Sequence, residues 1–144
     1  MPTRPVREII TRDRPLVGHP DDTVRTAAEE MAEHCYGSIL VCDGGKLRGI
    51  FTERDLLVRV VAAGRDAART RLAEVMTREP DTIGGSEPVV EAVRRMDECG
   101  YHHLPVLEED RLLGVIRLRD VPLEIIARLE RELSQRHALA ERMW

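Results

Sequence analysis

The sequence predicts an α+β protein made of two tandem repeats, each with the element order β-α-β-β-α. Three observations support this fold class. At a constant offset of 65 residues, ten of the 35 positions from 24 to 58 are identical to their counterparts from 89 to 123. Each copy also has apolar residues at helical spacing, and then two short apolar runs joined by a turn. A unit of about 60 residues is marginally stable alone, so we expect the repeats to pack with pseudo-two-fold symmetry and to share a core.

The first helix of each repeat is predicted from its apolar face and from its end signals. Asp21 and Ser86 are expected to cap the two helices at their N-termini, and Gly37 and Gly100 to end them. Apolar residues recur at i, i+3, i+4 and i+7, namely Val24, Ala27, Ala28 and Met31 in the first copy and Val89, Ala92, Val93 and Met96 in the second.

A β-hairpin is predicted after each of these helices. Gly44 and Gly45 suit the tight turn of the first hairpin because glycine adopts positive φ angles without steric cost. A second helix follows each hairpin and begins near Asp55 or Asp120. The predicted strands are 38–42 and 47–52 in the first copy and 103–107 and 112–117 in the second.

These elements divide the chain into three parts. The first repeat is predicted over residues 1–66, the second over 67–127, and a C-terminal helical extension over 128–144. Apolar residues recur every four positions at Ile125, Leu129 and Leu133, so the last helix is expected to run from about Asp120 to the end of the chain. We expect the extension to pack across a dimer or against a partner; the alternative is that it folds back on its own chain.

Composition and charge exclude several classes of function. The chain has 144 residues, a formal net charge of −4 and 3% aromatic residues, so a basic or base-stacking surface for nucleic acid is not expected. No apolar run approaches the roughly 20 residues that span a bilayer, and no secretory signal is visible at the N-terminus. We therefore expect a cytoplasmic protein without membrane contact. The cysteines, Cys35, Cys42 and Cys99, form no C-x-x-C pair, so we expect reduced thiols and no metal site.

One motif occurs in both copies and carries a family resemblance. Residues 49–55 (GIFTERD) and 114–120 (GVIRLRD) each have a glycine, two apolar residues, a polar residue and an aspartate three positions further on. With the LPV segment at 104–106, each copy resembles the CBS domain, named after cystathionine β-synthase. Two such domains in tandem resemble a Bateman module. The resemblance covers roughly residues 6–127.

The resemblance implies that a ligand containing adenosine binds in a cleft between the repeats. Candidate ligands are AMP, ADP, ATP, S-adenosylmethionine, NAD and cyclic dinucleotides. In the family the motif aspartates, here Asp55 and Asp120, receive the ribose hydroxyls, and Thr52 with nearby basic residues faces phosphate. The other expected ligand contacts are Arg54, Arg117 and Arg119 on the phosphate side, and Val17, Ser38, Ile39, Thr82, Ile83, His102, His103 and Leu104 around the adenine and before the hairpin.

The chemistry of these side chains agrees with such a site, although simpler interpretations exist. A carboxylate can accept both hydroxyls of a vicinal diol, and the Thr52 hydroxyl and the amides at a helix start can contact an anion. Alternatively, Asp55 and Asp120 only stabilise helix N-termini. Thr52 could be an edge-strand residue, and Arg54 and Arg119 solvated surface charges. His102 and His103 could contact phosphate, respond to pH near neutrality, or simply be one exposed and one packed histidine.

The two predicted sites are not equivalent. The first has Thr52 where the second has Arg117, and the family prefers Ser or Thr at this position. Arg117 could either bind phosphate or fill the pocket and block it. The segment expected beside the adenine, by contrast, suits adenine binding better in the second repeat (81–83, DTI) than in the first (15–17, PLV). We therefore expect either one site per chain or two sites of distinct affinity.

The expected function is regulatory rather than enzymatic. We expect a homodimeric adenine-nucleotide sensor that signals through an effector protein. The chain shows no nucleophile–base pair, phosphate-binding glycine loop or metal triad. The alternative is a CBS pair that dimerises as an interaction module and no longer binds a ligand.

Overall fold

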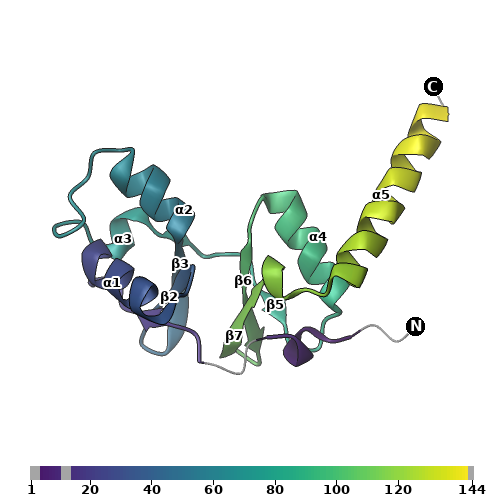
Figure 1. The fold of residues 1–144 in the computed structure, drawn as a ribbon. Helices are drawn as coiled ribbons and strands as arrows, with labels where there is room; N and C mark the ends of the chain where they lie inside the picture. Colours follow the sequence, from purple (N-terminus) through teal and green to yellow (C-terminus); the bar gives the residue numbers. More distant parts are fainter. Residues whose placement is uncertain (1–3, 11–13, 143–144) are drawn as a thin grey trace.

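The computed structural model describes residues 4–10 and 14–142. The two halves of the chain lie side by side, and the long C-terminal helix projects from the body (Figure 1). The first half contains η1 (Val6–Glu8), β1 (Val17–Gly18), α1 (Val24–His34), β2 (Ser38–Asp43), β3 (Lys46–Thr52), α2 (Glu53–Asp55) and η2 (Leu56–Val61). The second half contains α3 (Leu72–Val75), β4 (Thr77–Arg78), β5 (Ile83–Gly84), α4 (Val89–Cys99), β6 (His103–Glu108), β7 (Arg111–Arg117), η3 (Leu118–Asp120) and α5 (Leu123–Arg142). The α+β class and the two repeats are confirmed.

Both predicted hairpins are present. One sheet has the order β1-β2-β3-β4 and the other the order β5-β6-β7. Strands β2 and β3 pair antiparallel up to Asp43 opposite Lys46, and Gly44 and Gly45 between them have φ angles of 59° and 78°. This is the two-residue turn that favours glycine. The first strand of each sheet runs parallel to its neighbour, β1 to β2 and β5 to β6.

The helix ends differ in part from the prediction. Thr23, not Asp21, caps α1, because it directly precedes the helix and its Oγ1 accepts the Thr26 N–H at 3.2 Å. Helix α1 ends at Cys35, which has a left-handed φ of 58°, before Gly37 is reached. Helix α4 follows Pro88 with no side-chain cap, so Ser86 does not cap it. Gly100 ends α4 in the left-handed conformation, as predicted.

The second helix of the first repeat begins at Glu53, close to the predicted start near Asp55, whereas that of the second repeat begins later than predicted. After three α-helical residues, the helix following β3 continues as the π-helical turn η2. Asp120 lies in the 3₁₀ turn η3, and the last helix begins only at Leu123. Residues 143 and 144, at the end of the predicted extension, lie outside the described residues. Over the described ranges, the structure has no helix that is both long and apolar enough to traverse a bilayer.

Short segments are exchanged between the two halves. Strand β4 follows the first repeat in sequence, yet it pairs antiparallel with β3, with Gly49 opposite Arg78 and Ile50 opposite Thr77. In return, the N-terminal segment is held against the second half, where the Val6 N–H donates to the Glu87 carbonyl at 2.8 Å. The repeats are therefore connected by backbone pairing as well as by side-chain contact.

This exchange determines where the core lies. The expected common core takes the form of two clusters, each completed by a segment from the other half of the chain. The first contains Val24, Ala27, Met31, Ile39, Val41, Phe51 and Val60 together with Leu72 and Val75 from beyond the first repeat. The second contains Ile83, Val89, Ala92, Val93, Met96, Leu104, Val106, Ile116, Val121 and Leu129 together with Val6 from the N-terminus.

The glycine of the first motif is required by this arrangement. A Cβ at Gly49 would lie 2.5 Å from Met76 Sδ and 2.9 Å from the Thr77 carbonyl oxygen. Such distances exclude any side chain without a shift of the exchanged segment. The absence of a side chain at Gly49 therefore lets β4 approach β3.

Candidate functional site

Two clefts between the repeats are related by the internal repeat. The first cleft, about 510 Å³, is lined by Ile50, Thr52, Glu53, Arg54, Asp55, Val58, Arg59, Thr77, Pro80, Asp81, Cys99, Gly100, Tyr101, His102 and His103. The second cleft, about 20 Å³, is lined by Pro15, Leu16, Tyr36, Gly37, Ser38, Val115 and Arg117. Each of these second-cleft residues has its counterpart, 65 positions away, in the first cleft. These residues thus enclose a much smaller volume than the first cleft, although Tyr36, Gly37 and Arg117 also line a larger neighbouring cavity of about 670 Å³.

Asp55 is held firmly at one end of the first cleft. Its Oδ2 accepts the Thr52 N–H at 2.9 Å and the Thr52 hydroxyl at 3.1 Å, while Thr52 Oγ1 accepts the Asp55 N–H at 3.2 Å. This reciprocal pair is a capping box at the start of α2. Oδ1 faces Arg59 Nε at 3.6 Å, and the Asp55 side chain is 14% exposed. Oδ1 is therefore the oxygen that can accept further hydrogen bonds.

Arg59 connects this aspartate to the exchanged segment, and the sequence analysis did not identify it. Its Nη1 donates to the Val75 carbonyl at 2.9 Å and to the Met76 carbonyl at 3.1 Å. The sequence could have indicated this role, because Arg59 follows Asp55 by four residues and side chains at i and i+4 are neighbours on a helix surface. Arg59 thus stabilises the wall of the first cleft.

Arg117 occupies the corresponding place in the second cleft. Its Nε donates to Asp120 Oδ2 at 2.7 Å and its Nη2 to Asp120 Oδ1 at 3.0 Å. The two side chains are 13% and 19% exposed. This bidentate pair uses both oxygens of the second motif aspartate. Because Thr52 is much shorter than arginine, the first cleft has no equivalent obstruction.

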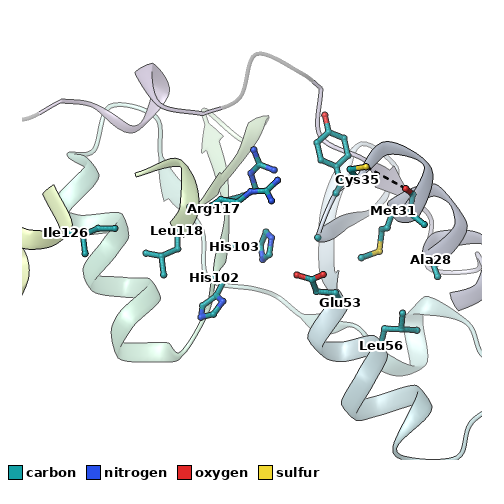
Figure 2. Close-up of a pocket in the computed structure, with 14 residues that line it drawn as sticks. Ala28, Met31, Cys35, Glu53, Leu56, His102, His103, Arg117, Leu118 and Ile126 are labelled. Carbon is teal, nitrogen blue, oxygen red and sulfur yellow. Dashed lines mark hydrogen bonds between the residues drawn. The ribbon is translucent and has the colours of Figure 1, made fainter. Parts of the chain in front are cut away.

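A third cavity, which we call the central cavity, lies between α1, α2 and the second repeat. It measures about 670 Å³, and its apolar lining includes Met31, Leu56 and Ile126. Figure 2 shows Arg117, His102, His103 and Glu53 between these apolar groups. The wall made by Glu53, His102 and His103 is common to the central cavity and the first cleft. Arg119 lines the central cavity and is not among the residues of the first cleft.

His103 is the more enclosed of the two histidines in this wall. A Cβ at Gly37 would lie 3.0 Å from His103 Nε2 and 3.2 Å from Glu53 Oε1, so both side chains pack against the Gly37 backbone. Burial lowers the pKa of His103; Glu53 opposes this shift, and the charges of Arg117, His102 and Arg119 add to it. His103 is therefore neutral at pH 7.

Several residues predicted on the adenine side lie elsewhere. Ile39, Ile83 and Leu104 are at most 2% exposed and belong to the two cores, because strand alternation turns them inward. Val17 is exposed but, like Thr82, lines none of the three cavities. The apolar contacts of the first cleft instead come from Ile50, Val58, Pro80 and Tyr101. The sequence could have indicated two of these residues, Pro80 and Tyr101, because each is identical to the residue 65 positions earlier, Pro15 and Tyr36.

The chain belongs to the CBS domain family, which matches residues 6–62 and 72–125. The mitochondrial CBS domain-containing protein CBSX3 of Arabidopsis thaliana is 30% identical over 123 residues, which make up 82% of this chain and 60% of that protein. The chain spans between 15% and 60% of the length of the first curated relatives that it matches.

Solved structures agree with this family. A CBS-domain protein from Burkholderia ambifaria, described as a signal-transduction protein, has 34% identity and a TM-score of 0.79 over 86% of this chain and 95% of its own. The CBS domain pair of protein MJ0100 has 26% identity and a TM-score of 0.74 over 89% and 96% of the two chains. That pair was solved in complex with 5′-methylthioadenosine and S-adenosyl-L-methionine.

The environment of His103 predicts a pH-dependent stability. Because the folded protein holds its pKa below the ordinary 6.5, the unfolded chain binds more protons as pH falls through that value. The contribution of His103 is thus complete above about pH 6.5 and declines below it. Urea unfolding at about pH 7.5 and about pH 5.5 should show a larger loss of stability in the wild type than in His103→Gln.

The exposed His34 on α1 provides the matched control. His34→Gln should leave the contribution of His103 to the pH dependence intact, since His34 lines none of the three cavities. Equal pH dependence in the wild type and in His103→Gln would show that burial of His103 has no effect on stability.

Proposed function

We propose that this protein is a regulatory module that binds one adenosine-containing molecule per chain in the first cleft and passes the signal to a partner without catalysing a reaction. The observation that carries the proposal is the contrast between two equivalent clefts. The cleft lined by Thr52 and Asp55 measures about 510 Å³, and the cleft lined by Arg117, the partner of Asp120, measures about 20 Å³.

Asp55 is the proposed ribose contact. Its Oδ2 is engaged by Thr52, which fixes the orientation of the carboxylate and leaves Oδ1 toward Arg59 and the cleft. A fixed carboxylate oxygen can accept hydrogen bonds from a vicinal diol, and such charge-assisted bonds are strong. The ligands solved with the MJ0100 pair are both adenosine derivatives, which supports the same ligand class here.

The base would lie against the less polar part of the cleft. Ile50, Val58, Pro80 and Tyr101 provide apolar surface beside the polar groups. A mostly apolar pocket with a few fixed polar groups is the usual composition of a small-molecule site. Asp120 would make no such contact, because Arg117 uses both of its oxygens.

The expected output is through a second copy of the chain and an effector protein. Val58 and Leu123 are repeat-equivalent positions, and both are more than half exposed, as are Leu57 and Val61. Exposed aliphatic residues at equivalent positions of both repeats suit a symmetric interface. We therefore propose a homodimer that covers Leu57, Val61 and Leu123, whereas Val58 borders the first cleft.

Calorimetric titration with S-adenosylmethionine and AMP tests the proposed site. Asp55→Asn should weaken binding about tenfold or more, because the loss of a charge-assisted contact costs about 1.5–3 kcal/mol. The asparagine oxygen can still accept the Thr52 N–H, and thermal unfolding checks that the fold is kept. Asp120→Asn is the matched control and should leave the affinity unchanged. Equal affinities of the wild type and Asp55→Asn would contradict the ribose contact, and no binding of any adenosine derivative to the wild type would favour the interaction-module alternative.

Light scattering at micromolar concentration tests the dimer. The wild type should have twice the chain mass of 16.3 kDa. Leu123→Glu should shift the mass toward that of one chain without unfolding the protein, since Leu123 is 82% exposed. A wild-type mass of one chain would refute the homodimer.

A further inference from the structure

We infer that the first cleft selects adenosine derivatives whose 5′ substituent carries no net negative charge, and that it disfavours nucleoside polyphosphates. This inference rests on the proposed function, because it concerns the ligand class of the same cleft. The charges of its described lining residues are the first argument. Three are carboxylates, Glu53, Asp55 and Asp81, and two are guanidinium groups, Arg54 and Arg59.

The positive charge available to a ligand is smaller than this count suggests. Arg59 donates to the carbonyls of Val75 and Met76 and faces Asp55, so its guanidinium is engaged by the protein itself. Arg54 is then the remaining arginine or lysine among the described lining residues. His103 is neutral at pH 7 because burial lowers its pKa. Glu53 and Asp81, by contrast, have no arginine or lysine within ion-pair distance among the described residues.

Several hydrogen-bond donors at the start of α2 are also in use. Phosphate groups commonly bind the free amides at such a position. Here the Thr52 N–H donates to Asp55 Oδ2, the Asp55 N–H donates to Thr52 Oγ1, and the Glu53 N–H donates to the Gly37 carbonyl at 3.0 Å. The Thr52 hydroxyl donates to Asp55 as well. The anion contact expected of Thr52 is therefore occupied within the protein.

The carboxylates of Glu53 and Asp81 and the engaged donors together disfavour an anionic 5′ substituent and allow a neutral or cationic one. A phosphate chain in this cleft would meet two carboxylates without arginine or lysine partners and a single available arginine, and like charges at short range repel. A thioether tail adds no charge, and a sulfonium or ammonium group would be attracted by Glu53 and Asp81. The favoured ligand class is thus an adenosine thioether or sulfonium compound rather than AMP or ATP.

Titration of the wild-type chain with five related probes tests this selectivity. These are adenosine, 5′-methylthioadenosine, S-adenosylmethionine, AMP and ATP, all in one buffer of low ionic strength. The expected result is that 5′-methylthioadenosine and S-adenosylmethionine bind about tenfold or more tightly than AMP, with ATP the weakest. Binding of AMP or ATP as tight as that of the thioether would overturn the inference. Failure of all five to bind would instead refute the proposed function.

A charge-neutralising variant tests the physical cause. In Glu53→Gln combined with Asp81→Asn, the ratio of the AMP Kd to the 5′-methylthioadenosine Kd should fall by about threefold or more. Because the ratio compares two ligands on one protein, it is insensitive to a partial loss of folded material. Glu33→Gln, on the exposed face of α1, is the matched control and should keep the wild-type ratio. An unchanged ratio in the double variant would overturn the assignment of selectivity to these carboxylates.

Discussion

The pairing of β4 with β3 is the interaction on which both the architecture and the open cleft depend. It inserts the start of the second repeat into the first sheet, with Thr77 opposite Ile50. The same pairing brings Pro80 and Asp81 to the cleft that contains Asp55. Neither repeat encloses this cleft alone, since its walls come from both halves of the chain. A ligand bound there would contact both repeats at once, which is a direct way to convert binding into a change of their packing.

Internal duplication made two similar clefts, which differ at several lining positions, including Thr52 and Arg117. Thr52 forms a compact capping box with Asp55, whereas the longer Arg117 forms a bidentate ion pair with Asp120. The Arg117–Asp120 pair is mostly buried, so breaking it to admit a ligand would leave a poorly solvated charge. The two repeats thus share a similar backbone, but the side chains around their motif aspartates differ.

Much of the fold and part of the site were predictable from the sequence. Helical periodicity, the Gly44–Gly45 turn and the offset of 65 residues are local or repeated signals, and the elements that they predict are present. The exchange of β4 was not predicted, because strand pairing between distant segments leaves no periodic pattern. The inward orientation of Leu104 also depends on the register of the whole sheet. Likewise, the engagement of Arg59 by backbone carbonyls becomes visible only once α3 is in place.

The stoichiometry of ligand binding tests the central claim most directly, namely that Arg117 closes one of two equivalent clefts. Titration of the wild type with 5′-methylthioadenosine should give one site per chain, and titration of Arg117→Thr, which restores the residue of the open cleft, should reveal a second site. Two equal sites per wild-type chain, or a variant that binds in the same way as the wild type, would contradict this account.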